Sequence, residues 1–260
     1  IEEEESTILK KKLEKGGCNF DESIIPITRK QYELIIDSVA TKPIIVDKPL
    51  ELPKAEDIQK AKEEIADSLI IDNDVIDRIV ASLYSGKSVL LTGPIGCGKT
   101  NLAKVIPKIV WKRDGGYYPE ISTATADWTT QDVIGGIVPT VVNKTAQFVV
   151  KKGVASQTVS ENWEDKTGAN RNRIFVRKDD DVYRGVWLVI DEFNRADIDK
   201  AFGSLFTALE YRENPGIKIP TDDKDNLFET LVVPKDFRII GTLNTKDKNY
   251  LFQMSDALKR

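Results

Sequence analysis

The sequence reads Gly93-Pro94-Ile95-Gly96-Cys97-Gly98-Lys99-Thr100 at the point that decides its fold, a match to the phosphate-binding pattern G-x-x-x-x-G-K-[ST]. An apolar run at 88–91 precedes it, and the residues from Asn101 continue as a helix. A strand that ends in a glycine-rich turn and opens a helix directs several backbone N–H groups to one point, where a triphosphate can accept them. The pattern predicts that Lys99 reaches the β- and γ-phosphates and that Thr100 ligates Mg²⁺. The predicted nucleotide-binding residues are Gly93, Pro94, Ile95, Gly96, Cys97, Gly98, Lys99, Thr100 and Asn101.

The composition is that of a globular protein. Its 260 residues, 40% of them hydrophobic, are enough for one large or two small domains with a substantial core. The apolar runs are short and interrupted by charges, and the acidic start without Met does not resemble a signal peptide. We therefore expect a cytoplasmic protein without membrane partners. This start and the ending at 258–260 suggest a fragment of a longer polypeptide.

The absence of His narrows the chemistry further. Without imidazole there is no His general base, no Ser-His-Asp triad and no His metal site, so any hydrolysis must use carboxylates and a bound metal. The two cysteines, Cys18 and Cys97, lie far apart and indicate neither a disulfide framework nor a zinc site. The net charge of −4 gives no global attraction to nucleic acid, although a local basic groove stays open.

Proline spacing marks residues 1–54 as an N-terminal extension or linker, which contains helical pieces at 2–15 and 29–39. Residues 55–260 form the predicted main domain. Its expected helices are 55–70, 72–83, the segment after the phosphate loop, 153–163 and 197–211, and its expected core strands are 88–91, 118–124, 186–190 and 237–244. A capped short helix is predicted at 129–136. An insertion of about 137–184, with little core character in its polar part, contains a predicted hairpin at 138–150 that turns at Asn143-Lys144.

Strands separated by helical segments imply an α/β fold with a parallel sheet, in which ligands bind at the carboxyl ends of the strands. Gly93, Asp191 and Asn244 all fall at such ends. The strand at 186–190 runs into the pair Asp191-Glu192. Beside the phosphate loop, Asp191 can hold Mg²⁺ through its water shell, and Glu192 can orient and deprotonate the water that attacks the γ-phosphate. Alone, the same pair would be read as a strand followed by a surface turn.

Together these stretches resemble the AAA+ ATPases, in the group that contains MoxR-type ATPases, the McrB motor of a restriction system, and dynein- and midasin-related modules. The resemblance covers about residues 55–260. It implies a P-loop NTPase core with a parallel sheet flanked by helices and a β-hairpin insertion. The stretches that carry it are 93–100, 127–136, Asp191-Glu192-Phe193-Asn194-Arg195-Ala196 and Gly241-Thr242-Leu243-Asn244-Thr245.

The resemblance assigns further roles. It makes Asn244 the sensor that positions the attacking water, so that the catalytic set becomes Glu192, Asn244 and Lys99. The segment 138–163 is similar to the helix-2 insertion that faces the central channel of ring-shaped relatives; the alternative is a hairpin that packs on its own core. Arg195 could contact a neighbouring subunit's nucleotide or form a local salt bridge. Arg260 is a candidate for the arginine finger that acts on a neighbour.

The resemblance implies Mg²⁺-dependent hydrolysis of ATP, with GTP left open, in a ring that we expect to be a hexamer. A MoxR-like ATPase would remodel protein partners, whereas a McrB-like translocase would act on DNA for a nuclease partner. A third hypothesis, a nucleotide-gated scaffold with little turnover, is disfavoured by the presence of Glu192. The helical lid and its second sensor are absent from the sequence, so we expect the fragment to bind nucleotide weakly and to assemble poorly.

Overall fold

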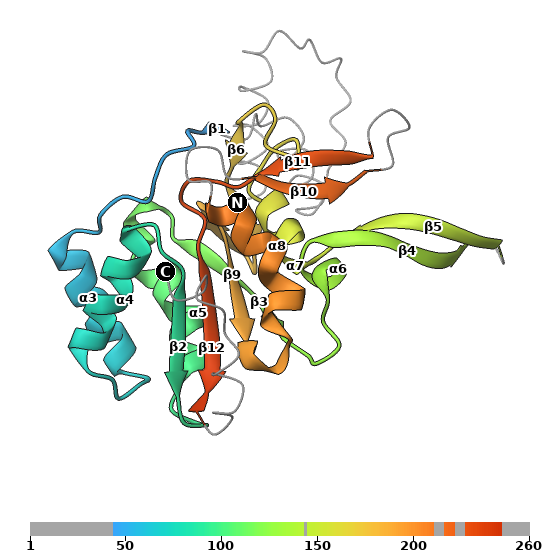
Figure 1. The fold of residues 1–260 in the computed structure, drawn as a ribbon. Helices are drawn as coiled ribbons and strands as arrows, with labels where there is room; N and C mark the ends of the chain where they lie inside the picture. The colour runs from blue at the N-terminus through green and yellow to red at the C-terminus, as the bar shows by residue number, and fades with distance from the viewer. Residues whose placement is uncertain (1–43, 143–144, 211–215, 222–226, 246–260) are drawn as a thin grey trace, which may run out of the picture. The chain divides into compact units, whose positions relative to one another are not determined.

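The computed structural model describes residues 44–142, 145–210, 216–221 and 227–245 (Figure 1). They belong to the second of two compact units, residues 43–260. The helices predicted at 2–15 and 29–39, Cys18, the turn at Asn143-Lys144 and Arg260 lie outside the described residues.

A parallel sheet of four strands in the order β2-β12-β9-β3 forms the centre of this unit (Figure 1). The strands are β2 (Val89–Gly93), β3 (Tyr117–Thr123), β9 (Gly185–Asp191) and β12 (Ile239–Asn244). The register pairs Asn244 with Gly93, and Thr123 with Asp191. The predicted α/β fold with a parallel sheet is confirmed, and the carboxyl ends of the strands meet at one edge.

Strand β9 is buried on both faces of the sheet. Leu188 and Ile190 join one hydrophobic cluster, whereas Trp187 and Val189 join the other. This division follows from the alternation of side chains along a strand, and it explains why the sequence of β9 is a continuous apolar run. The sheet is therefore the middle layer between two groups of helices.

One group consists of α3 (Ala55–Ala66), α4 (Asn73–Tyr84) and α5 (Lys99–Ile109). Asp72 caps α4 by accepting the N–H of Asp74 at 3.0 Å. Pro107 lies in the last turn of α5, so the helix ends two residues later. Trp187 is stacked on Tyr117 of β3, with ring centroids 4.4 Å apart, beneath this layer.

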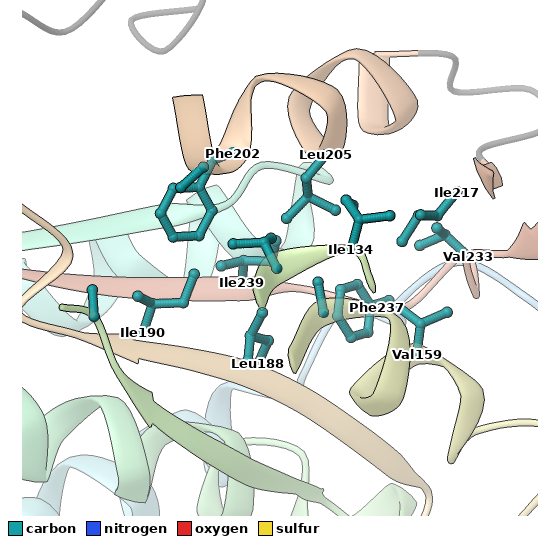
Figure 2. Close-up of a cluster of buried hydrophobic side chains, with 14 of the residues drawn as sticks. Ile134, Val159, Leu188, Ile190, Phe202, Leu205, Ile217, Val233, Phe237 and Ile239 are labelled. Atoms are coloured by element: carbon teal, nitrogen blue, oxygen red, sulfur yellow. The ribbon is translucent and has the colours of Figure 1, made fainter. Parts of the chain in front are cut away.

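The other face carries α6 (Thr130–Val133), α7 (Val154–Ser160) and α8 (Ile198–Glu210), together with the antiparallel pair β10 (Gly216–Pro220) and β11 (Phe228–Val232). Figure 2 shows Phe202 and Leu205 of α8 above Leu188 and Ile239 of the sheet, and Val159 of α7 to one side of them in the same cluster. The sequence did not predict β10. Its burial alternates over only five residues, which is too short a signal to separate from a loop.

The predicted hairpin is confirmed as β4 (Gly135–Val142) paired antiparallel with β5 (Thr145–Lys152). It projects away from the sheet (Figure 1). Close packing fixes its base, since a Cβ on Gly153 would lie 2.4 Å from the carbonyl carbon of Val133. Phe148 is 76% exposed, so within the described residues the hairpin does not pack on a core of its own.

Two segments lie closer to the core than their sequences suggest. Helix α7, inside the predicted insertion, buries Val159 against the sheet. Strand β1 (Ile44–Ile45), inside the predicted linker, pairs with β6 (Arg173–Ile174), and Trp111 donates its indole N–H to the carbonyl of Glu51 at 2.9 Å. Short elements complete the described chain: η1 (Lys112–Asp114), β7 (Val176–Lys178), β8 (Asp181–Tyr183) and η2 (Phe193–Arg195).

A buried charged cluster ties this polar region to the sheet. Arg173, which is 0% exposed, forms an ion pair with Asp236, which also binds Arg184 at 3.3 Å and accepts the hydroxyl hydrogen of Tyr117 at 2.8 Å. Burial, and then the negative charge of Asp236, raises the pKa of Tyr117 above its ordinary value. The second guanidinium nitrogen of Arg173 donates to Asn162 at 3.2 Å. The ion pair with Asp236 thus compensates the charge of Arg173 inside the core.

None of the helices in the described parts of the chain has the length and apolar character needed to cross a bilayer.

Candidate nucleotide site

The phosphate loop joins β2 to α5 in a conformation that requires glycine. Gly96 and Gly98 have φ angles of 82° and 84°, in the left-handed region that other residues rarely adopt. A Cβ on Gly98 would also lie 2.5 Å from Cδ2 of Leu69. Helix α5 begins at Lys99, so the N–H groups of its first turn have no partner inside the helix and carry its positive dipole end. This arrangement favours an anion at the loop.

The ammonium group of Lys99 lies against the loop itself. Its Nζ donates to the carbonyl oxygens of Gly93 at 3.0 Å and Pro94 at 2.7 Å, and it lies 3.7 Å from Sγ of Cys97. These three predicted binding residues therefore contact Lys99 and do not line the cleft. An incoming phosphate would offer Lys99 a stronger, charged acceptor in place of two carbonyls.

Asp191 lies at the end of β9 and accepts hydrogen bonds from two hydroxyl groups. Its Oδ1 accepts from Oγ1 of Thr100 at 2.7 Å and from Oγ1 of Thr242 at 2.6 Å. The structure thus brings together the two residues predicted to hold the metal. Thr242 was missed as a site residue. Its only signal was a polar side chain in an otherwise apolar strand, two positions before Asn244.

Glu192 follows Asp191 in a left-handed backbone conformation, with φ of 54°. Its N–H donates to Oγ1 of Thr242 at 3.1 Å. Its carboxylate binds Nε of Arg195 at 2.7 Å through Oε2 and meets Nδ2 of Asn244 at 3.4 Å through Oε1. Arg195 thus makes the local salt bridge, one of the two roles left open by the sequence. Its side chain is 58% exposed, and its contact with a neighbouring subunit stays a prediction.

These groups surround one cleft of about 330 Å³ at the carboxyl edge of the sheet. Thr100 and Asp191 offer hard oxygen donors, which suit Mg²⁺. No cluster of three or more acidic, Cys or His side chains that could hold a metal occurs in the described ranges. That donor set fits an ion that keeps several waters and binds one or two side chains plus phosphates. The residues that line the cleft are Ile95, Gly96, Gly98, Lys99, Thr100, Asn101, Asp191, Glu192, Thr242 and Asn244.

Comparison with known proteins places this site in a family. The model of the AAA domain (dynein-related subfamily) matches residues 88–260, which include the phosphate loop, both acids and Asn244. The EcoKMcrB subunit of a type IV methyl-directed restriction enzyme from Escherichia coli (strain K12) is 26% identical over 199 residues, which cover 76% of this chain and 39% of that protein. The chain therefore spans about two fifths of the length of this relative.

A solved structure, that of a candidate ATPase from Cytophaga hutchinsonii, is 17% identical with a TM-score of 0.42 over 73% of this chain and 43% of that one. The family match spans most of the chain and contains every group that surrounds the cleft. The chain belongs to the AAA domain family, in its dynein-related subfamily.

Proposed function

We propose that this chain binds ATP together with Mg²⁺ and hydrolyses the γ-phosphate bond. One observation carries the proposal. The ends of three parallel strands bring a lysine, a hydroxyl, two acids and an amide to the same cleft, at the residues Lys99, Thr100, Asp191, Glu192 and Asn244. Phosphoryl transfer requires mainly positioning and charge neutralisation, which this set can supply.

Each residue has a chemically suitable task. The first N–H groups of α5 and Lys99 would hold the phosphates, with Lys99 leaving the carbonyl oxygens of the loop. Thr100 and Asp191 would hold Mg²⁺, which when bound neutralises negative charge on the phosphates. Glu192 would accept a proton from the attacking water. Asn244, whose amide both donates and accepts, would orient that water.

The contacts of Glu192 bear on its role as a base. One carboxylate oxygen is paired with Arg195 and the other faces Asn244. A carboxylate has about four lone-pair sites, so Glu192 can still accept a proton from water with both contacts in place, and release of Arg195 would free Oε2 entirely. Because Arg195 is more than half exposed, a neighbouring subunit's phosphate could draw it away. Arg195 would then form the local salt bridge with Glu192 in the isolated chain and the predicted contact with a neighbouring subunit in a ring.

The substitution Glu192→Gln tests the assignment. The variant should bind ATP with an affinity within about threefold of the unmodified protein. Its hydrolysis rate should fall by about 10²–10⁴-fold, which is what a positioned general base contributes. Glu63→Gln, an exposed position on α3, is the matched control and should change neither quantity. Hydrolysis by E192Q at the unmodified rate would refute Glu192 as the base.

The work done by hydrolysis is a second part of the proposal. Rings, expected to be hexamers, are implied by the resemblance to MoxR-type and McrB-type ATPases, and the projecting hairpin β4–β5 is the segment compared with the channel-facing insertion. The 26% identity to a restriction-enzyme subunit favours the McrB-like hypothesis over MoxR-like remodelling of protein partners. The presence of Glu192 in the cleft disfavours a scaffold with little turnover.

These hypotheses differ in what stimulates hydrolysis. A McrB-like subunit should hydrolyse GTP or ATP faster when methylated duplex DNA is added than when unmethylated duplex is added. A protein remodeller should respond to neither duplex. Hydrolysis rates with ATP and with GTP, each measured with both duplexes, separate the two hypotheses and show whether the site prefers adenine or guanine nucleotides.

A further inference from the structure

Thr242 occupies a position between the two acids of the site, although no chemical step requires it. It lies on β12, next to β9 in the sheet, and is 2% exposed. Its hydroxyl donates to Oδ1 of Asp191 at 2.6 Å and accepts the backbone N–H of Glu192 at 3.1 Å. A hydroxyl has one hydrogen and two lone pairs, so it can make both bonds at once.

The contacts of Thr242 lie beside the contact between Asn244 and Glu192, because side chains alternate along a strand. Residues two apart on a strand share a face, so Thr242 and Asn244 lie on the same face of β12. The first contacts Asp191 and the backbone of Glu192, and the second contacts the side chain of Glu192. One face of β12 therefore sets the geometry of both acids.

We propose that Thr242 is a positioning residue that fixes the metal-holding acid and the base relative to each other. The inference rests on the proposed function of the site. Two hydroxyls, from Thr100 and Thr242, hold Oδ1 of Asp191, and in the described residues no hydrogen bond to Oδ2 accompanies them. Oδ2 is therefore the oxygen that can accept from the water shell of the metal.

The backbone contact has a separate effect. Glu192 adopts a left-handed conformation that a non-glycine residue rarely holds without support from its surroundings. The hydroxyl of Thr242 gives its N–H a partner in this conformation. Loss of the hydroxyl leaves that N–H without this partner and lets the turn relax, which redirects the carboxylate of Glu192.

Replacement of Thr242 by Val removes the hydroxyl and keeps the shape. Removal of a partner of a metal-ligating group typically costs about 10–100-fold in metal affinity or activity. We expect T242V to raise the Mg²⁺ concentration for half-maximal hydrolysis, and to lower kcat, each by about tenfold or more. The KM for ATP should change by less than about threefold, because the phosphate loop is untouched. T242S keeps the hydroxyl and should restore both quantities to within about threefold.

The matched control is Thr158→Val. Thr158 is a buried threonine on α7 whose hydroxyl donates to the carbonyl of Val154 at 2.7 Å, so T158V loses a buried hydroxyl away from the site. If T242V does not fold, T242S and T242A form a second pair, since both lack the γ-methyl group and only Ser has the hydroxyl. Mg²⁺ dependence and kcat within twofold of T158V would overturn the proposal.

The outcomes also separate this inference from the proposed function. If E192Q hydrolyses ATP like the unmodified protein, the proposed base is wrong. If E192Q is inactive while T242V retains the unmodified kcat and Mg²⁺ dependence, the proposed function stands and the role of Thr242 is refuted.

Discussion

Substitution of Asp236 by Asn should destabilise the protein more than any other single change in the buried charged cluster. Arg173 is 0% exposed, and its ion pair with Asp236 is the one that compensates its charge among the described residues. Breaking a buried pair from one side costs about 3–5 kcal/mol, because the remaining charge is left uncompensated. This loss is a large part of the free energy of unfolding of such proteins, which is roughly 5–15 kcal/mol.

Removal of the other partner should cost less. In Arg173→Met, Asp236 keeps Arg184 at 3.3 Å and the hydroxyl of Tyr117 at 2.8 Å, so its charge stays compensated. The loss then reduces to two hydrogen bonds of Arg173, to Oδ1 of Asn162 and to the carbonyl of Arg184, about 1–3 kcal/mol in all, since Oδ1 of Asn162 still accepts the N–H of Val186. The double variant should be more stable than D236N alone, because it no longer buries the unpaired charge of Arg173, whereas Arg184 loses its partner Asp236 in both variants.

Equilibrium unfolding in urea measures these differences. The indole rings of Trp111, Trp163 and Trp187 are 0–1% exposed, so their fluorescence reports the loss of the core. With a slope of about 2 kcal/mol per molar urea, a loss of 4 kcal/mol lowers the midpoint by about 2 M. The reasoning is refuted if D236N costs less than R173M, or if the double variant is less stable than D236N.

Three further predictions concern the site and the pH dependence of stability. Gly98→Ala should weaken ATP binding in a titration, because its Cβ would meet Leu69 and its φ of 84° is strained for alanine. A strain of about 1–3 kcal/mol corresponds to a loss of roughly 5- to 160-fold in affinity. Since the pKa of Tyr117 is raised in the folded state, mainly by burial, the stability that it contributes is complete below about pH 10 and is lost as the pH rises further. Urea midpoints measured between pH 8 and 11, roughly, should therefore fall less steeply in Y117F than in the unmodified protein. Arg195→Ala should change the free energy of unfolding by less than about 1 kcal/mol, because the ion pair with Glu192 is exposed on the arginine side, and a larger loss in urea unfolding would contradict this.

The sequence was sufficient to predict those parts of the structure that local pattern determines. The apolar run before Asp191 could only be a strand covered on both faces, and β9 is buried in that way. The carboxyl ends of parallel strands share an edge, so Asp191 and Asn244 could be assigned to the phosphate loop across long stretches of chain. The roles of these residues remain predictions that the substitutions above test.

The contacts that the sequence did not predict depend on strand order and on partners far apart in the chain. The role of Thr242 requires β12 to lie beside β9, and nothing local specifies this neighbour. Arg173 stands in a polar stretch and would ordinarily be exposed, since arginine is seldom fully buried without a partner. Its partner Asp236 lies 63 residues away. Burial of Arg173 could be predicted only from a fold that places Asp236 beside it.

The hairpin β4–β5 behaves as a module whose length can change while the cleft stays the same. Its strands pair residue for residue, with Ile137, Pro139 and Val141 opposite Val150, Phe148 and Ala146, so one face is apolar throughout. Because side chains alternate, adding or removing two residues from each strand keeps that face intact, whereas a change of one residue turns it over. The attachment at Gly153 is closely packed, whereas Val141 and Phe148, further along the described strands, are 73% and 76% exposed, so we expect related proteins to vary in length away from the attachment. Relatives could therefore differ in how far the hairpin reaches without any change in the residues around the nucleotide cleft.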